Sequence, residues 1–213
     1  MNQENIQKKM DRFLQELESK GDVPTLLLHS CCGPCSSYVI SYLSDYFSIT
    51  VFFYNPNIFP QNEYEKRKLE QKRLIEEMPS KYPVVFLEGD YAPEQFESIA
   101  SGVENAPEGG ERCTRCYAMR LRETARLGKA ENFDYFTSTL SVSPYKNAEK
   151  LNYLGRKIGE EMEIPFLEAD FKKKEGYKKS IALSREYNLY RQDYCGCRFS
   201  FEIHEQQKEE ESQ

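Results

Sequence analysis

The fold of this chain is decided by the stretch TLLLHSCCGPC, which occupies residues 25–35. It begins as a short apolar run, and three cysteines follow the run directly. A continuous apolar run of this length is typical of a strand that is buried on both faces of a parallel sheet. A helical pattern near residues 34–46 starts at the proline. The sequence therefore predicts a strand that leads through a cysteine loop into a helix.

The same alternation of strand and helix patterns continues along the chain. Further β-rich runs lie at residues 50–54, 84–87, 134–138 and 165–167. Further helical patterns lie near residues 61–78, 113–129 and 146–162. This order predicts an α/β fold with a doubly wound, mainly parallel, Rossmann-like sheet of about five strands. The first three runs are apolar throughout, so we expect them to be buried on both faces.

The chain is expected to form a single domain. We predict an N-terminal helix at residues 1–22, the α/β domain at 23–200, and an acidic tail at 201–213 that is solvated or disordered. The Pro- and Gly-containing stretch 90–112 is interpreted as a mobile excursion around a short helix. The first twenty residues show no leader pattern, and no apolar run approaches the ~20 residues of a membrane helix. We therefore expect a cytoplasmic protein with no membrane partner.

All seven cysteines fall into three tight groups. The groups are Cys31, Cys32 and Cys35; Cys113 and Cys116; Cys195 and Cys197. Ligands of parallel α/β sheets collect at the carboxyl ends of the strands, and the first two groups are expected at that edge. Two Cys-x-x-Cys pairs are compatible with a structural zinc site. Four thiolates from separate loops are equally compatible with an iron-sulfur cluster.

The group Cys195-Gly196-Cys197 points to a different role. A disulfide across a single intervening residue would be strained, and strain makes a disulfide easier to reduce. Such a pair is suited to cycling between dithiol and disulfide. The alternative is that these residues are spare ligands or inert thiols.

Seven blocks of sequence, in a fixed order, carry a resemblance to a known family. They are residues 28–36 (LHSCCGPCS), 54–58 (YNPNI), 63–67 (EYxxR), 88–91 (EGDY), 112–121 (RCxxCYxxRL), 137–146 (TSTLxxSPYK) and 194–197 (YCGC). Over residues 23–200 the chain resembles the QueH family of epoxyqueuosine reductases. The resemblance implies cobalamin-independent, reductive removal of the epoxide oxygen from epoxyqueuosine at the wobble position of tRNA.

The resemblance also implies a fold similar to the adenine-nucleotide α-hydrolase-like proteins. In those proteins a glycine-rich loop after the first strand holds ATP phosphates. Here cysteines and a proline stand in that place. Because these residues cannot give the close backbone approach of a phosphate cradle, we expect no ATP chemistry.

The family pattern assigns roles to six of the cysteines. It implies that a [4Fe-4S] cluster is bound by Cys31, Cys32, Cys113 and Cys116, and that the redox-active pair is Cys195 and Cys197. Spacing alone would choose the pair Cys32 and Cys35 as ligands, so the role of Cys35 stays open. A second metal beside the cluster is conceivable, with Cys35 or the Cys-x-Cys thiols and an oxygen ligand such as Asp90. An unidentified electron donor is a further implied partner.

Loss of the epoxide oxygen as water also needs a proton donor. The candidates in the sequence are Tyr117, Tyr194 and Asp90, although each is also explained as a packing or capping residue. His29 ends the first predicted strand beside the cysteines. We interpret it as a structural residue or a support for a ligand, and not as a ligand itself.

The net charge of −6 is unevenly distributed along the chain. Basic side chains concentrate at residues 112–129 and 171–198, both next to cysteine groups. We expect a basic rim that binds tRNA phosphates, and we name Arg120, Arg126, Lys173 and Lys174 as its test residues. The alternative is an ordinary solvated helix face.

Aromatic side chains provide surfaces on which an unstacked anticodon base can stack. Tyr145 and Tyr177 are the candidates, since each neighbours a lysine. Two other functions compete with the reductase: an iron-free thiol-disulfide oxidoreductase and a zinc-stabilised RNA-binding module.

Overall fold

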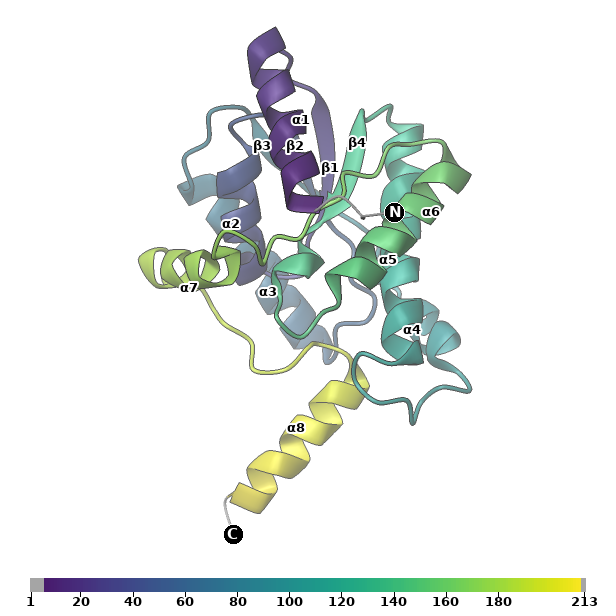
Figure 1. Cartoon of the computed structure of the whole chain (residues 1–213). Coiled ribbons are helices and arrows are strands. Elements are labelled where there is room, and N and C mark those ends of the chain that lie inside the picture. Colours follow the sequence, from purple (N-terminus) through teal and green to yellow (C-terminus); the bar gives the residue numbers. More distant parts are fainter. Residues whose placement is uncertain (1–5, 212–213) are drawn as a thin grey trace.

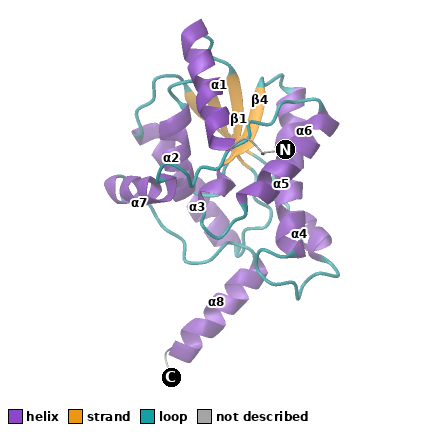
Figure 2. Cartoon of the chain, viewed as in Figure 1, coloured by secondary structure: helices purple, strands orange, loops and turns teal. Residues whose placement is uncertain are grey.

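One parallel sheet lies at the centre of the molecule. The structure is a computed structural model that describes residues 6–211. Its strands are β1 (Thr25–His29), β2 (Ser48–Phe53), β3 (Val84–Glu88) and β4 (Tyr135–Ser138). They are all parallel and lie in the order β3-β2-β1-β4, with helices on both sides (Figures 1 and 2). The predicted doubly wound, Rossmann-like class is confirmed, with four strands in place of five.

The strand predicted at residues 165–167 is the one that does not form. Phe166 makes only an isolated bridge with Phe136 of β4. The chain then turns away, because the backbone N–H of Ala169 donates to the side-chain oxygen of Asn152 at 2.8 Å. A helix side chain thus takes the hydrogen bonds that would have extended the ladder.

Six of the eight helices in the described residues follow the predicted patterns, whereas the last two in the chain were not predicted from the sequence. The helices are α1 (Ile6–Lys20), α2 (Gly33–Leu43), α3 (Gln61–Glu77), α4 (Pro93–Ala100), α5 (Glu111–Ala130), α6 (Ala148–Met162), α7 (Gly176–Glu186) and α8 (Arg198–Glu211), with a short 3-10 turn at Thr139–Val142. The helix α4 is the short helix expected within residues 90–112.

Apolar side chains pack on both faces of the sheet. On β1, Leu26 and Leu28 join the core formed with α1, α2 and α3, whereas Leu27 joins the core with α5 and α6. The first two strands are therefore largely buried, as expected. The expectation is wrong for β3, where Val85 is 52% exposed, because β3 is an edge strand and only part of it is covered.

The two terminal helices differ in their packing. On α1, Met10, Leu14 and Leu17 are buried in the sheet core, so the helix predicted at 1–22 packs directly on the α/β domain. In contrast, α8 extends away from the body (Figure 1) and buries Phe199 alone. The predicted tail at 201–213 is thus a solvated helix as far as Glu211, and not a disordered segment. Residues 1–5 and 212–213 lie outside the described part.

The chain order creates a crevice at one edge of the sheet. After β1 the chain enters α2, which packs with α1 and α3, whereas after β4 it proceeds to α6, which packs with α5. Adjacent parallel strands whose connections leave to opposite faces open a ligand site at their carboxyl ends. The cysteines after β1 lie at this point. No helix within residues 6–211 has the length and apolarity needed to cross a membrane.

Candidate active site

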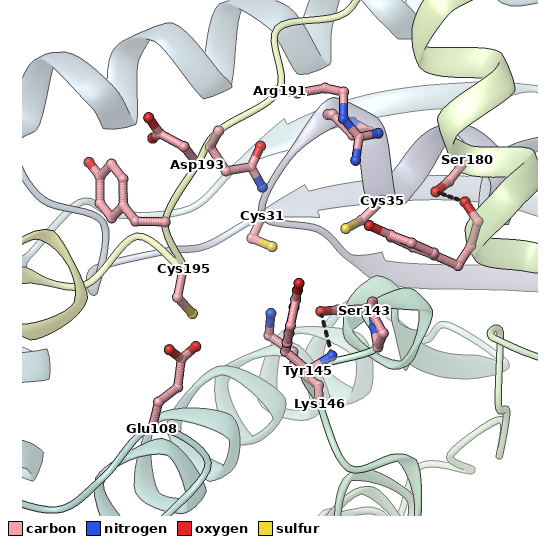
Figure 3. Close-up of a pocket in the computed structure, with 15 residues that line it drawn as sticks. Cys31, Cys35, Glu108, Ser143, Tyr145, Lys146, Ser180, Arg191, Asp193 and Cys195 are labelled. Carbon is pink, nitrogen blue, oxygen red and sulfur yellow. Dashed lines mark hydrogen bonds between the residues drawn. The ribbon is translucent and has the colours of Figure 1, made fainter. Parts of the chain in front are cut away.

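A cavity of about 410 Å³ lies at the carboxyl ends of β1 and β4. Its wall comes from the start of α2, the loop before α6, and the segment between α7 and α8. Figure 3 shows Cys31, Cys35 and Cys195 around this space, with Lys146 on the side of the α6 loop. Residues separated by up to 164 positions (31 to 195) thus meet at one site.

The three cysteine groups lie next to one another. The sulfur atoms of Cys31 and Cys32 are 4.0 Å apart, and Cys113 packs against the same apolar cluster. Cys116 and Cys197 are both buried in the adjacent cluster, which includes Phe96 and Phe199. The first two groups therefore lie at the carboxyl edge of the sheet, as expected from the sequence, and the Cys-x-Cys group lies beside them.

Burial and neighbouring thiols shift the ionisation of these cysteines. Burial raises the pKa of Cys116 to about 12. A hydrogen bond with Cys31 lowers the pKa of Cys32, but the hydrogen bond with Cys35 and burial outweigh it and raise the pKa to about 11. The pKa of Cys35 is instead lowered, chiefly by its hydrogen bond with Cys32. The thiols that the sequence identified as ligands are therefore neutral unless something electropositive ionises them.

Buried cations surround the thiols. Arg120 is only 2% exposed, and its Nε donates to the carbonyl of Cys116 at 3.3 Å. Within residues 6–211 its guanidinium forms no ion pair with a carboxylate. An isolated buried charge is costly unless it is compensated. The groups near the guanidinium that can become negative are the thiols of Cys116, Cys31 and Cys195 and the phenol of Tyr117.

The chemistry of these thiols fits a thiolate-bound iron cluster, since clustered thiolates would give the Arg120 guanidinium a negatively charged partner. The side chains do not stand in a ready ligating arrangement, however. In the described part of the chain, no group of three or more His, Cys, Asp or Glu side chains could hold a metal ion as placed.

Lys146 is a cavity residue that the sequence reasoning missed. Its ammonium has no hydrogen-bond or ion-pair partner among the residues described, and it lines the cavity. Burial lowers the pKa of Lys146, but Cys195, Cys31 and Cys35 raise it by more, so the net shift is upward. The signal was present in the block Ser143-Pro144-Tyr145-Lys146, which ends at this residue.

The three proton-donor candidates have different positions. Tyr194 lines the cavity, but its hydroxyl donates to the carbonyl of Phe59 at 2.5 Å. Tyr117 is buried in the core, and burial raises its pKa. Asp90 does not line the cavity; its charge acts on Tyr54 and Arg126 instead. Lys146 is therefore better placed than any of them.

His29 is held on both sides of its ring. One ring nitrogen lies 2.9 Å from Ser138 Oγ and the other lies 3.1 Å from the carbonyl oxygen of Tyr54. Burial lowers its pKa to about 3. The ring is thus neutral and occupied, which agrees with a structural role.

The predicted basic rim needs correction. Arg120 is buried, so it is not a surface residue, and Arg126 and Lys174 are ion-paired with Glu123 and Asp11. Lys173 is exposed and forms no ion pair with the residues described. The other exposed basic residues of α5 also have acidic partners: Arg115, Arg122 and Lys129 pair with Glu111, Glu161 and Glu163.

Exposed cations remain on α7 and in the segment after it, where Arg191 lines the cavity. Lys179, Arg185 and Arg191 are exposed and form no ion pair within the described range. Tyr145, which is 81% exposed, and Tyr177 line the cavity. Both aromatic candidates are therefore available at the site.

Comparisons with known proteins agree with these features. The family model described as "Epoxyqueuosine reductase QueH" matches residues 26–203. The chain is 39% identical to the protein of that name from Staphylococcus epidermidis, over 92% of this chain and 84% of the relative. It is 40% identical to the one from Streptococcus pyogenes, over 88% and 76%, and 34% identical to the one from Thermotoga maritima, over 83% and 90%. The chain belongs to the QueH family of epoxyqueuosine reductases, and is an oxidoreductase.

Proposed function

We propose that this protein reduces epoxyqueuosine at the wobble position of tRNA to queuosine, without cobalamin. The observation that carries the proposal is that two cysteine groups line one cavity, through Cys31, Cys35 and Cys195, while the third group, Cys113 and Cys116, packs into the apolar clusters that contain their neighbours. Its volume of about 410 Å³ lies within the range of small-molecule sites. The names of the relatives support the substrate.

The reaction requires two electrons and two protons for each epoxide. The two carbon–oxygen bonds break, the carbon–carbon double bond forms, and the oxygen leaves as water. Oxidation of the Cys195 and Cys197 thiols to a disulfide releases two electrons and two protons, so this step balances. An external donor must then reduce the disulfide before the next turnover. The test is the conversion of epoxyqueuosine to queuosine in tRNA under single and multiple turnover.

We assign the cluster ligands to Cys31, Cys32, Cys113 and Cys116. Their support is their shared place at the edge of the sheet, together with the unpaired charge of Arg120. When bound there, a [4Fe-4S] cluster supplies electron transfer and Lewis acidity. Cys35 stays outside this set, at the cavity wall. The position of Asp90 gives no support for its use as a ligand of a second metal.

Lys146 is expected to contribute directly to removal of the oxygen. Its unpartnered ammonium faces the cavity and can donate a hydrogen bond to the epoxide oxygen as negative charge develops there. Lys146→Met should lower the single-turnover rate about 100-fold, in the range found for removal of one such donor. Lys146→Arg keeps a cationic donor and should recover part of the rate. A Met variant with the wild-type rate would exclude this role.

Binding of tRNA is expected to use the cations near Tyr177. Charge reversal at Lys179, Arg185 and Arg191 should weaken binding and reduce the slope of log Kd against log salt by about two, at roughly 0.7 for each single-strand phosphate contact. Reversal of Arg122 and Arg126 is the matched control, because both already have glutamate partners. Equal slopes for the wild type and the first variant would show that α7 does not bind the phosphates.

A further inference from the structure

The segment between α7 and α8, residues 187–197, lies across one face of α3. We refer to it as the strap. Arg73 of α3 donates to the carbonyl of Tyr187 at 2.9 Å. One turn earlier on α3, the carboxylate of Glu70 accepts from the backbone N–H of Tyr190 at 2.5 Å. Charged side chains of a single helix thus hold the backbone of the strap.

The last contacts of this series reach the Cys-x-Cys group. Arg67 donates through Nη1 to the carbonyl of Cys195 at 3.2 Å and through Nη2 to that of Tyr194 at 3.4 Å. Its Nε donates to Glu63 at 2.7 Å, and the hydroxyl of Tyr190 donates to the same carboxylate at 3.0 Å. Arg67 is only 1% exposed. A buried fork of this kind holds its partners in one geometry.

The backbone conformation at Gly196 and its close contact with Arg67 explain why a glycine separates the two cysteines. Its φ of +126° lies where side chains are rarely found. A Cβ at this position would stand 2.9 Å from Nη1 of Arg67, which is closer than real Cβ contacts. The carbonyl of Gly196 also accepts from the backbone N–H of Phe59 at 2.7 Å. The glycine therefore allows the guanidinium to approach the backbone between the two thiols.

These contacts give a role to a sequence motif that the proposed chemistry leaves unused. Residues 63–67 were part of the family resemblance, yet they line no part of the cavity. Among residues 6–211, the side-chain hydrogen bonds of Arg67 all go to Glu63 or to the strap. Cys195, the residue after Tyr194 in the strap, faces the cavity beside Cys31 (Figure 3).

We propose that Arg67, oriented by Glu63, is a positioning residue that fixes Cys195 at the cavity wall. The proposal rests on the proposed redox function of Cys195 and Cys197. The fork binds the carbonyls of the two peptide groups that flank the Cα of Cys195, and it leaves the thiol free to face the substrate. Without the fork, the strap would keep its attachments to Glu70, to Arg73 and to the backbone N–H of Phe59, but the two carbonyls that flank the Cα of Cys195 would lose their donor.

The test uses the double variant Glu63→Gln/Arg67→Met in the iron-loaded protein. Changing both residues avoids a buried carboxylate without its partner, which would endanger folding. The turnover number should fall at least tenfold, while KM for tRNA stays within twofold. The rate at which iodoacetamide alkylates Cys195, followed by peptide mass spectrometry, should rise at least fivefold. The matched control Glu70→Gln/Arg73→Met removes the corresponding pair farther from the thiols. It should leave the turnover number and the alkylation rate of Cys195 within twofold of wild type.

A second variant keeps the ion pair intact. Gly196→Ala should reproduce the loss of turnover and the faster alkylation, because the new Cβ displaces the strap from the guanidinium. Wild-type alkylation and turnover in both variants would overturn the proposal. Wild-type turnover and alkylation in the single variant Arg67→Lys would also overturn the proposal, since one ammonium keeps the charge but cannot bind both carbonyls and Glu63 at once. If a Cys195→Ser/Cys197→Ser variant retains turnover, the redox function fails, whereas the alkylation rates still decide the positioning role.

Discussion

Replacing both Cys195 and Cys197 with Ser is expected to abolish multiple-turnover conversion of epoxyqueuosine in tRNA. The proposed dithiol provides both electrons and both protons. A variant without it therefore has no internal reductant that an external donor could restore after each turnover. The fold should hardly change, because a loop closed across one residue restricts the unfolded chain very little. The structure also has both residues as free thiols. The melting temperature and the cluster absorption should therefore stay near wild type.

The measurement is the yield of queuosine per enzyme, with excess tRNA and a chemical reductant. Cys35→Ser is the matched control, since it removes a cavity thiol that lies outside the proposed pair. Full multiple-turnover activity in the double variant would remove the pair from the mechanism. Loss of the cluster from that variant would instead make the two thiols metal ligands.

The order of strands and helices could be predicted because it depends on local patterns. The apolar run at 25–29 and the proline after the cysteines are sufficient to mark β1 and the start of α2. Position within the sheet is not local. The run at 84–87 is as apolar as a central strand but forms the edge. The short run at 165–167 makes only an isolated bridge, because Asn152 takes the backbone hydrogen bonds of Ala169 just beyond it.

The cysteines of the site could be found from the sequence, but the charges around them could not. The sequence next to a cysteine group does not show whether the guanidinium of a neighbouring arginine faces solvent or the core. Arg120 was expected on a tRNA-binding surface and is buried beside Cys116 and Cys31. Arg67 contacts a segment 128 residues away, and only the packing of the strap on α3 brings the two together.

Alanine at each of Cys31, Cys32, Cys113 and Cys116 is expected to remove most of the bound iron and sulfide. The physical reason is that a [4Fe-4S] cluster is held by four thiolates, so the loss of any one of them leaves an iron site without its ligand. The wild-type protein, purified without oxygen, should be brown, with broad absorption at about 400 nm. Iron and sulfide analysis of each variant, normalised to folded protein, gives the result.

Cys35→Ala separates the two possible ligand sets. Both sets contain Cys32, Cys113 and Cys116, so only the difference between Cys31 and Cys35 is informative. Both Cys31 and Cys35 lie within hydrogen-bond reach of Cys32. The burial of Cys31 favours the adjacent pair, whereas Cys35 is partly exposed at the cavity. Full iron in Cys31→Ala together with loss of iron in Cys35→Ala would establish the two Cys-x-x-Cys pairs as ligands. A colourless wild-type protein with stoichiometric zinc would contradict both sets as cluster ligands and would support an RNA-binding module, because zinc has no redox chemistry with which to reduce an epoxide.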